Sequence, residues 1–384
     1  MSYMFNLNRN FLLSTIANFL FFVNFSSFFL LPLFLDEQGF TKSDIGILMG
    51  SFGISSILLT PFTSTFIDKF GKKLLGSIAL ATMIISSILF VYLNSMILLF
   101  ILRLFQGASF SIFFNSSSAL ASDNLQDNNR KKGLSIFYSS TIFPYFVGPF
   151  FGELIILNYG YVYFFLFSSI FSFLALLIII KIDSKNYINK TNIKIKFRDF
   201  FYIISDAKSK KYLLTNFLSS TGFGIIMNFI AIFLKDKTLK SGLFFAIYSI
   251  VVTILRLFMS EFISESKLFK KILIMLMFFS ISIYFLPIID DTLDIIIFAI
   301  IFSSTYGLIY PFISSLLVKP GSEDTSGRLF GALNATFGIG VHLMTFFFGY
   351  LIHFYGFDFG FKTCSIFIFS ITLMLFVKEK KHNE

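Results

Sequence analysis

Long apolar segments alternate with short polar ones along the whole chain. A hydrocarbon core of ~30 Å needs about 20 apolar residues as a helix, and helices satisfy their backbone hydrogen bonds internally. The apolar segments of this length are 11–35, 45–67, 74–93, 96–120, 133–157, 161–182, 211–234, 241–263, 270–289, 293–318, 327–352 and 357–377. Some neighbouring spans meet at very short turns, as at Tyr355-Gly356, but merging them would give helices too long for a bilayer. The pattern therefore predicts an all-α integral membrane protein with twelve transmembrane helices.

The longest polar stretch, residues 183–210, lies between the sixth and seventh spans. It divides the chain into a six-helix bundle at 1–182, a cytoplasmic linker at 183–210 and a second six-helix bundle at 211–384. The loop after the second span and the loop after the eighth both place an acid before a Lys pair, and the two Lys pairs lie 198 positions apart. Six spans per repeat is an even number, so both copies have the same orientation. The sequence thus predicts two pseudo-symmetric bundles, an arrangement in which transporters bind substrate between the halves.

Composition and charge support a membrane protein. Hydrophobic residues make up 56% of the 384 residues and charged residues only 14%, which excludes a soluble domain. The net charge is +10, but the basic residues occur as short clusters in loops, which argues against a nucleic-acid partner. With the N-terminus in the cytoplasm, 24 of the 31 Lys and Arg residues fall on the cytoplasmic side. We therefore expect a multi-pass protein of the cytoplasmic membrane with both termini in the cytoplasm.

Enzyme chemistry has no support in the sequence. There is no phosphate-binding Gly-rich loop, and three His and one Cys do not make a typical zinc site. We expect no catalytic residue, no cofactor and no metal. Without a nucleotide site, transport would draw on an ion gradient or on the gradient of the substrate itself.

The loop after the second span carries a motif. Its sequence is Ser64-x-x-x-Asp68-Lys69-x-Gly71-Lys72-Lys73. It resembles the signature loop of the major facilitator superfamily, Gly-x-x-x-Asp-Arg-x-Gly-Arg-Arg, with Ser at the first Gly and Lys at each Arg. The resemblance extends over nearly the whole chain. It implies the major facilitator fold, a monomer working by alternating access, and a gating role for Asp68, Lys69, Gly71, Lys72 and Lys73.

Two further motifs favour export. The fourth span contains Arg103-x-x-Gln106-Gly107, which is similar to a family motif associated with proton coupling in exporters. The fifth span contains Gly148-Pro149-x-x-Gly152, which resembles the antiporter motif of drug-type exporters and implies gating roles for Gly148, Pro149 and Gly152. A packing kink remains an alternative for the fifth span, and a snorkelling or helix-bridging Arg remains one for Arg103. A charge inside hydrocarbon costs at least ~2.5–3.5 kcal/mol, so Arg103 should face the bundle interior.

The proton carrier has several candidates. Acidic and imidazole groups inside spans form proton relays in transporters. Glu153 in the fifth span and His342 in the eleventh join Arg103 as coupling candidates, although a lone His can also be a hydrogen-bonded packing residue. Arg256 in the eighth span could pair with Glu261 or Glu265.

Polar residues inside the spans are candidates for substrate binding. Midplane amides can bind a substrate or simply join helices. The candidates are Asn18, Asn24, Asn115, Tyr138, Asn216, Asn228, Tyr306, Tyr310 and Asn334.

We therefore predict a secondary transporter that exports a small molecule by proton antiport, with protons and the lipid bilayer as its other partners. The substrate would be a drug-like compound, a metabolite or a metallophore, since residues 103–152 also resemble the branch of opine-metallophore exporters. An importer of a sugar or carboxylate is one alternative. A membrane receptor or scaffold without transport activity is another.

Overall fold

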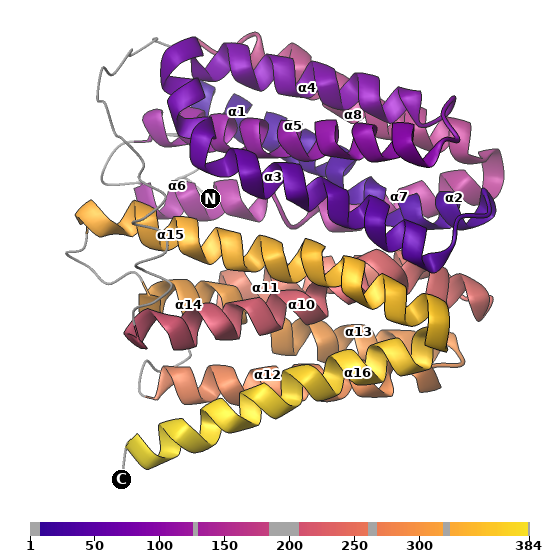
Figure 1. The fold of residues 1–384 in the computed structure, drawn as a ribbon. Coiled ribbons are helices and arrows are strands. Elements are labelled where there is room, and N and C mark those ends of the chain that lie inside the picture. Colours follow the sequence, from indigo (N-terminus) through magenta and orange to yellow (C-terminus); the bar gives the residue numbers. More distant parts are fainter. Residues whose placement is uncertain (1–7, 126–129, 184–206, 260–266, 318–322, 383–384) are drawn as a thin grey trace. The chain divides into compact units, whose positions relative to one another are not determined.

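The computed structural model describes residues 8–125, 130–183, 207–259, 267–317 and 323–382. These residues form helices and connecting turns, with no β-strand among them (Figure 1). The helices of the first half are α1 (Arg9–Ser27), η2 (Phe28–Leu30), α2 (Leu31–Glu37), α3 (Lys42–Phe70), α4 (Lys72–Leu89), α5 (Met96–Asp123), α6 (Arg130–Ser139), α7 (Pro144–Tyr159) and α8 (Tyr161–Ile179). Those of the second half are α10 (Ala207–Asp236), α11 (Ser241–Ile254), η4 (Leu255–Met259), α12 (Leu268–Phe285), η5 (Leu286–Ile288), α13 (Thr292–Tyr306), α14 (Ile309–Leu317), α15 (Glu323–Gly338), η6 (Ile339–Leu343) and α16 (Met344–His382).

Within the described residues, eleven helical segments are long and apolar enough to cross a membrane. The last of them, Gly331–Glu379, has 49 residues, which at 1.5 Å per residue is more than twice the ~30 Å of a hydrocarbon core. It contains Gly356, whose φ of 82° and ψ of 170° are not helical. Figure 1 shows the chain reversing direction between the start and the end of α16. This segment therefore holds two spans, as the sequence predicts at Tyr355-Gly356, and the fold is the predicted all-α membrane fold.

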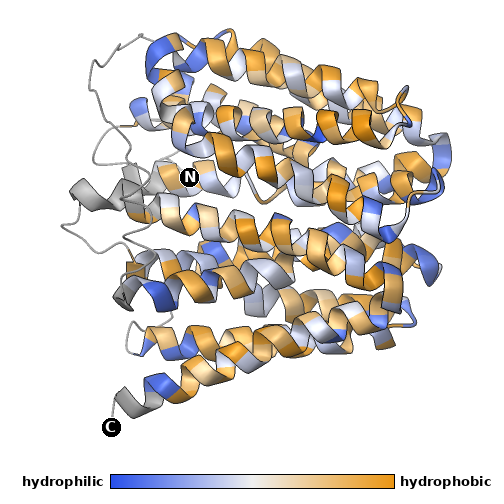
Figure 2. Cartoon of the chain, viewed as in Figure 1, coloured by the Kyte–Doolittle hydropathy of each residue, from blue (hydrophilic) through white to orange (hydrophobic). Residues whose placement is uncertain are grey.

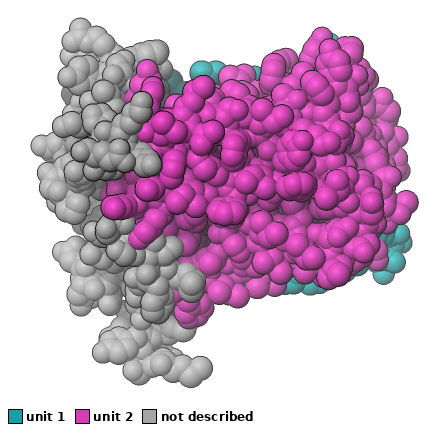
Figure 3. All heavy atoms as spheres, turned by 90° about the horizontal axis from the view of Figure 1, so that it is seen from below, with its two compact units in different colours: residues 1–34, 54–192 teal, residues 35–53, 193–384 magenta. Residues whose placement is uncertain are grey.

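Two compact units divide the chain. Unit 1 contains residues 1–34 and 54–192, and unit 2 contains residues 35–53 and 193–384 (Figure 3). The segment 35–53 comes from the first half of the sequence, yet it packs with unit 2. The predicted bundle boundaries at 182 and 211 stay a prediction.

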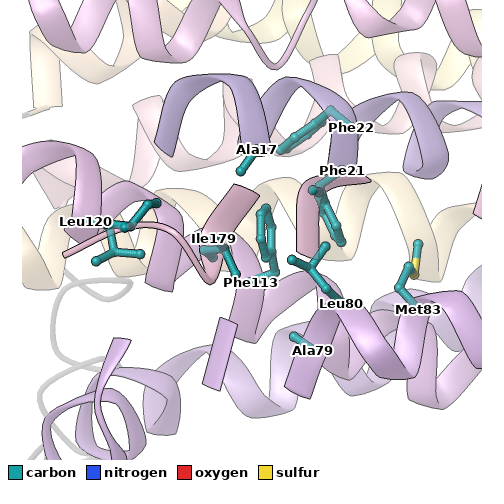
Figure 4. Packing of buried hydrophobic residues seen from close by; sticks show 11 residues of the cluster. Ala17, Phe21, Phe22, Ala79, Leu80, Met83, Phe113, Leu120 and Ile179 are labelled. Carbon is teal, nitrogen blue, oxygen red and sulfur yellow. The ribbon is translucent and has the colours of Figure 1, made fainter. Parts of the chain in front are cut away.

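Apolar side chains from α1, α4, α5 and α8 form the core of unit 1. Phe21 of α1 stacks on Phe113 of α5 with ring centroids 4.2 Å apart, and Leu80 of α4 lies beside them (Figure 4). Ala17 and Ala79 are small and buried, so the helices approach closely there. Hydrophobic residues dominate the middle of the helices, while hydrophilic residues gather toward their ends (Figure 2).

Several spans are interrupted. Residues 140–143 form a turn between α6 and α7, directly before Pro144, whose ring cannot continue a helix from the preceding turn. In unit 2, η4 and η6 are single wide π-helical turns inside the eighth and eleventh spans. Such turns replace the regular hydrogen bonds between residues four apart with bonds between residues five apart, and they are frequent at functional sites. The fifth, eighth and eleventh spans therefore all depart from regular α-helical geometry.

Candidate functional site

The signature loop joins α3 to α4. Gly71 has a φ of 89°, a conformation that glycine adopts without strain and that allows the tight turn between the two helices. Asp68 and Lys69 are exposed on the last turn of α3, and the Lys69 ammonium lies 5.1 Å from the centre of the Phe70 ring. Asp68 has no hydrogen bond or ion pair with any other described residue.

The two lysines after Gly71 fasten α4 to its neighbours in unit 1. Lys72 forms an ion pair with Asp123 at the end of α5. Lys73 donates a hydrogen bond of 3.0 Å to the carbonyl oxygen of Ile182, which follows α8. The loop thus connects the ends of three spans at one side of unit 1. Its gating role remains a prediction.

The antiporter-like motif brings α7 against α1. A Cβ atom at Gly148 would lie 2.4 Å from the Ser26 hydroxyl oxygen and 2.8 Å from the Val23 carbonyl oxygen, both on α1. The Ser26 hydroxyl also donates a 2.7 Å hydrogen bond to the carbonyl oxygen of Pro144. One turn further, a Cβ at Gly152 would lie 3.0 Å from the Phe164 ring. Gly148 is therefore a place where the two helices touch through their backbones.

Pro149 acts on the same helix. It has no N–H group, so the carbonyl four residues earlier lacks its usual helical donor. The whole motif is buried at Gly148, Pro149 and Gly152.

Arg103 is buried inside unit 1, with 4% of its surface exposed. Its Nη1 donates a 2.9 Å hydrogen bond to Oε1 of Gln106, one turn later on α5. Its guanidinium lies 5.9 Å from the centre of the Phe28 ring in η2. The expectation that this Arg faces the interior of its bundle is met. Gln106, part of the same sequence motif, is a functional candidate that the sequence reasoning quoted but did not assign a role.

The other two coupling candidates lie in different units. Glu153 is half-buried on α7 in unit 1. His342 is half-buried in the π-helical turn η6 of unit 2, and its ring centroid is 5.4 Å from that of Phe52. A Cβ at Gly53 would lie 2.1 Å from Cβ of His342, so Gly53 provides the space for the imidazole. Packing therefore accounts for the place of His342, and its coupling role stays a prediction.

Two buried amides of unit 1 join helices. Asn18 donates to the Ser140 hydroxyl at 2.9 Å and accepts from the Ser117 hydroxyl at 3.1 Å. Asn24 donates to the Ser87 hydroxyl at 3.1 Å and to the carbonyl oxygen of Ser168 at 2.7 Å. Both are 0% exposed. These bonds tie α1 to α4, α5, α8 and the turn before α7.

The remaining candidates of unit 1 are more accessible. Asn115 is half-buried and donates to the carbonyl oxygen of Ser111 on its own helix, at 2.7 Å. Tyr138 on α6 is 48% exposed. These two are the substrate-binding candidates of unit 1 that are not fully buried.

Unit 2 repeats the joining of helices through amides. Asn216 of α10 donates to the Leu333 carbonyl oxygen at 2.8 Å and to the Thr336 hydroxyl at 3.0 Å. Asn228 of α10 donates to the Gly224 carbonyl oxygen at 2.7 Å and to the Thr345 hydroxyl at 3.2 Å. Both amides are buried, and a role in substrate binding stays a prediction for each.

A cluster of aromatic side chains lies between α10, α13, α14 and α15. Tyr306 stacks on Phe223 with centroids 4.7 Å apart and an interplanar angle of 4°. Phe337 lies 6.2 Å from Phe223 and 5.6 Å from Tyr310. The Tyr310 hydroxyl donates a 2.7 Å hydrogen bond to Oδ1 of Asn334, whose side chain is exposed. The structure thus brings three predicted site residues into one cluster. Tyr310 contacts Asn334 directly, and Tyr306 is linked to Tyr310 through the rings of Phe223 and Phe337.

A charged cluster at the end of α2 was missed as a unit by the sequence reasoning. Asp36 pairs with Lys42 at the start of α3 and with Lys235 at the end of α10, the latter at 3.1 Å. All three residues belong to unit 2. Close to the cluster, a Cβ at Gly46 would lie 3.0 Å from Cα of Gly349. The spacing of Gly46, Gly50 and Gly53 along one helix face is the sequence signal that could have indicated this close packing.

Arg256 in η4 donates from Nε to the carbonyl oxygen of Gly307, at 3.0 Å, where α13 gives way to α14. Its suggested partners Glu261 and Glu265 lie outside the described residues. No group of three His, Cys, Asp or Glu side chains in the described part of the chain could hold a metal ion.

The family model described as "Major Facilitator Superfamily" matches residues 11–341. The chain belongs to the major facilitator superfamily. It is therefore a multi-pass membrane transporter with a small-molecule substrate and not an enzyme, as its family and its relatives show.

Curated relatives of this major facilitator protein include a resistance protein and an export protein. It is 28% identical over 119 residues to the quinolone resistance protein NorA of Staphylococcus aureus, a match that covers 31% of each chain. It is 22% identical over 366 residues to the staphylopine export protein of Staphylococcus aureus (strain Mu50 / ATCC 700699), covering 91% of this chain and 90% of the relative. The chain thus spans about a third of NorA and nearly all of the staphylopine exporter.

Solved structures show the same fold. A crystal structure of a mutant of the nucleoside transporter NupG matches with a TM-score of 0.81 at 14% identity, covering 96% of this chain and 98% of that one. The human organic anion transporter MFSD10 (TETRAN) matches with a TM-score of 0.71 at 16% identity, covering 96% and 99%. These likenesses concern the fold alone.

Proposed function

We propose that this transporter exports a small molecule across the cytoplasmic membrane by proton antiport and alternating access, with both termini in the cytoplasm. The observation that carries the proposal is the packing of the Gly148-Pro149-x-x-Gly152 motif. Backbone contact at Gly148 and the interruption before Pro144 give α7 a defined pivot against α1. The relation to NorA and to the staphylopine exporter supports export over uptake.

Coupling is assigned to Arg103, Glu153 and His342. Arg103 is a fixed charge inside unit 1, and Glu153 is a titratable group in the same unit. Protonation of Glu153 would change its charge, and so its attraction to a buried cation in unit 1. His342 contributes a second titratable group in unit 2.

Gating is assigned to the loop from Asp68 to Lys73 and to α7. The loop already fastens three span ends of unit 1 through Lys72 and Lys73, while Asp68 is exposed and available to another partner. Substrate binding is assigned to the exposed or half-buried Asn115, Tyr138, Tyr310 and Asn334. The buried residues Asn18, Asn24, Asn216, Asn228 and Tyr306 stay secondary candidates for substrate binding.

Transport into inside-out membrane vesicles tests the proposal. An imposed pH gradient, acid inside, should drive uptake of a labelled quinolone or of staphylopine, and a protonophore should abolish it. Glu153→Gln should remove the dependence on the gradient, whereas the matched variant Glu37→Gln, at an exposed acid at the end of α2, should retain it. Uptake only in right-side-out vesicles would establish an importer instead. Failure to move any of a broad panel of compounds in either orientation would favour a receptor.

A further inference from the structure

Gln106 leaves an amide donor inside unit 1. Arg103 and Gln106 are 4% and 0% exposed, and the guanidinium donates to Oε1 of the amide. A guanidinium has donors only, so the atom of Gln106 that faces it must be the carbonyl oxygen. The NH₂ group therefore points away from this bond, and Nε2 has no hydrogen-bond partner among the described residues.

A buried donor of this kind calls for an acceptor. Nearly all buried polar groups in proteins are hydrogen-bonded, because a group removed from water otherwise loses its bonds. Residues three apart on a helix lie on the same face, so the amide donor is next to a guanidinium. A single carboxylate has two oxygens that can accept from both groups at once, and bonds between ionised groups are the stronger ones.

We propose that Arg103 and Gln106 form a binding site for the carboxylate group of the exported compound. Arg103 supplies the charge, and the Gln106 amide supplies a directional donor beside it. Phe28 covers the guanidinium from η2, at 5.9 Å between the cation and the ring centre. The site lies seven residues into α5, about 10 Å from the start of that helix at 1.5 Å per residue. This inference rests on the proposed function in one respect, namely that the bound compound is exported. The binding of a carboxylate by Arg103 and Gln106 does not depend on the direction of transport.

A carboxylate at this site has two sources. One is the substrate, and the other is Glu153, the half-buried acid of α7 in the same unit. Both use the same chemistry, so the experiment must separate them.

Binding of benzoate to the purified full-length protein in detergent tests the site, with benzamide as the neutral probe of the same shape. Calorimetry should show benzoate binding at least tenfold more tightly than benzamide. Gln106→Leu removes the donor and should weaken benzoate binding at least tenfold. Gln106→Glu places a carboxylate beside Arg103 and should abolish binding. The control Asn124→Asp changes the charge equally at the other end of α5 and should bind benzoate as the unmodified protein does.

Several results would overturn the site. Equal affinity for benzoate and benzamide would show that the site does not recognise the negative charge. Chloride binding as tight as benzoate binding would show that the site does not recognise the carboxylate group. If benzoate binding survives in both Gln106 variants, benzoate binds elsewhere in the protein. If benzoate binds only to the Glu153→Gln variant, the partner of Arg103 and Gln106 is the Glu153 carboxylate of the protein itself. Should Gln106→Glu fail to fold, Gln106→Leu alone decides. These measurements need no pH gradient, so a failure of export and a failure of the site are separate results.

Discussion

Unit 1 and unit 2 bury different chemistry. In unit 1, Arg103 is the one charged side chain among the buried residues that the structure describes, and it sits beside an amide donor. In unit 2, the buried residues that the structure describes include no charged side chain, and Tyr306 packs between the rings of Phe223 and Phe279. Unit 1 therefore holds the buried charge that the proposed carboxylate site requires, whereas the stacked rings named in unit 2 are an apolar packing contact.

The packing of the helices is nevertheless similar in the two units. In unit 1, Gly148 brings α7 against the backbone of α1. In unit 2, a Cβ at Gly340 would lie 2.7 Å from the Phe217 carbonyl oxygen on α10. The interruption of the fifth span ends at Pro144, and the residue 198 positions later is His342, inside the π-helical turn of the eleventh span. Both units thus have a glycine at a close contact with a helix backbone and a break in the span that carries this glycine, although Gly148 and Gly340 are not 198 positions apart.

The clearest expected difference in transport rate concerns the loops after the second and eighth spans. Asp68→Asn should lower the initial export rate roughly tenfold, the effect of about 1.4 kcal/mol, with near-normal protein in the membrane. The repeat-related change Glu265→Gln should leave the rate within about twofold, because the second loop lacks the Gly and Asp of the signature. Vesicle uptake normalised to blotted protein measures both. Full activity of Asp68→Asn would remove the gating role of this loop.

The glycine contacts should matter equally in both units. Gly148→Ala and Gly340→Ala place a methyl group against backbone atoms and should each destabilise the protein by roughly 1–3 kcal/mol. Gly331→Ala is the matched control, because nothing lies within 4 Å of its added Cβ. Thermal melting of the purified variants in detergent gives the order. A strong effect in one unit only would show that the packing has diverged as the chemistry has.

Amides that join helices should contribute moderately. Asn18→Leu and Asn216→Leu each remove two hydrogen bonds between segments and should cost about 0.6–2 kcal/mol. Asn115→Leu removes only a bond within α5 and should change the melting temperature least of the three. If Asn18→Leu instead melts normally and loses transport, its amide binds substrate.

The smallest effect is expected in the aromatic cluster around Tyr306. Tyr306→Phe keeps the stacked ring and should melt close to the unmodified protein, whereas Tyr306→Leu should lose about 0.5–1.5 kcal/mol. Melting curves of the two variants separate the contribution of the ring from that of the hydroxyl. Equal destabilisation by both would indicate that the hydroxyl dominates.

Much of the fold follows from the sequence because the membrane restricts the choices. The length of the apolar segments predicted the spans. The last two spans are separated at Gly356, whose non-helical backbone divides a segment that is too long for a single crossing of the bilayer. Pro144 is the local sequence signal for the interruption of the fifth span, because its ring cannot continue a helix from the preceding turn. The π-helical turns at 255–259 and 339–343 contain no proline, and nothing local in the sequence distinguishes them from regular helix.

The sequence was enough to predict which residue types belong to the candidate site. It was not enough to predict which groups each of these side chains contacts. Arg103 had to face the interior, since hydrocarbon excludes charge. The directions of Asn18, Asn24, Asn216 and Asn228 depend on how neighbouring helices rotate, which apolar periodicity does not determine when a span is apolar on every side. For the same reason the sequence did not show that residues 35–53 pack with unit 2, or that Asp36 pairs with Lys235.

Proton release on substrate binding tests the central claim most directly. A quinolone or staphylopine is added to the purified protein in weakly buffered detergent near neutral pH, and a pH-sensitive dye records the protons released. Antiport predicts release that follows substrate binding and is lost in Glu153→Gln. Saturating substrate binding without any release from the unmodified protein would contradict proton-coupled export.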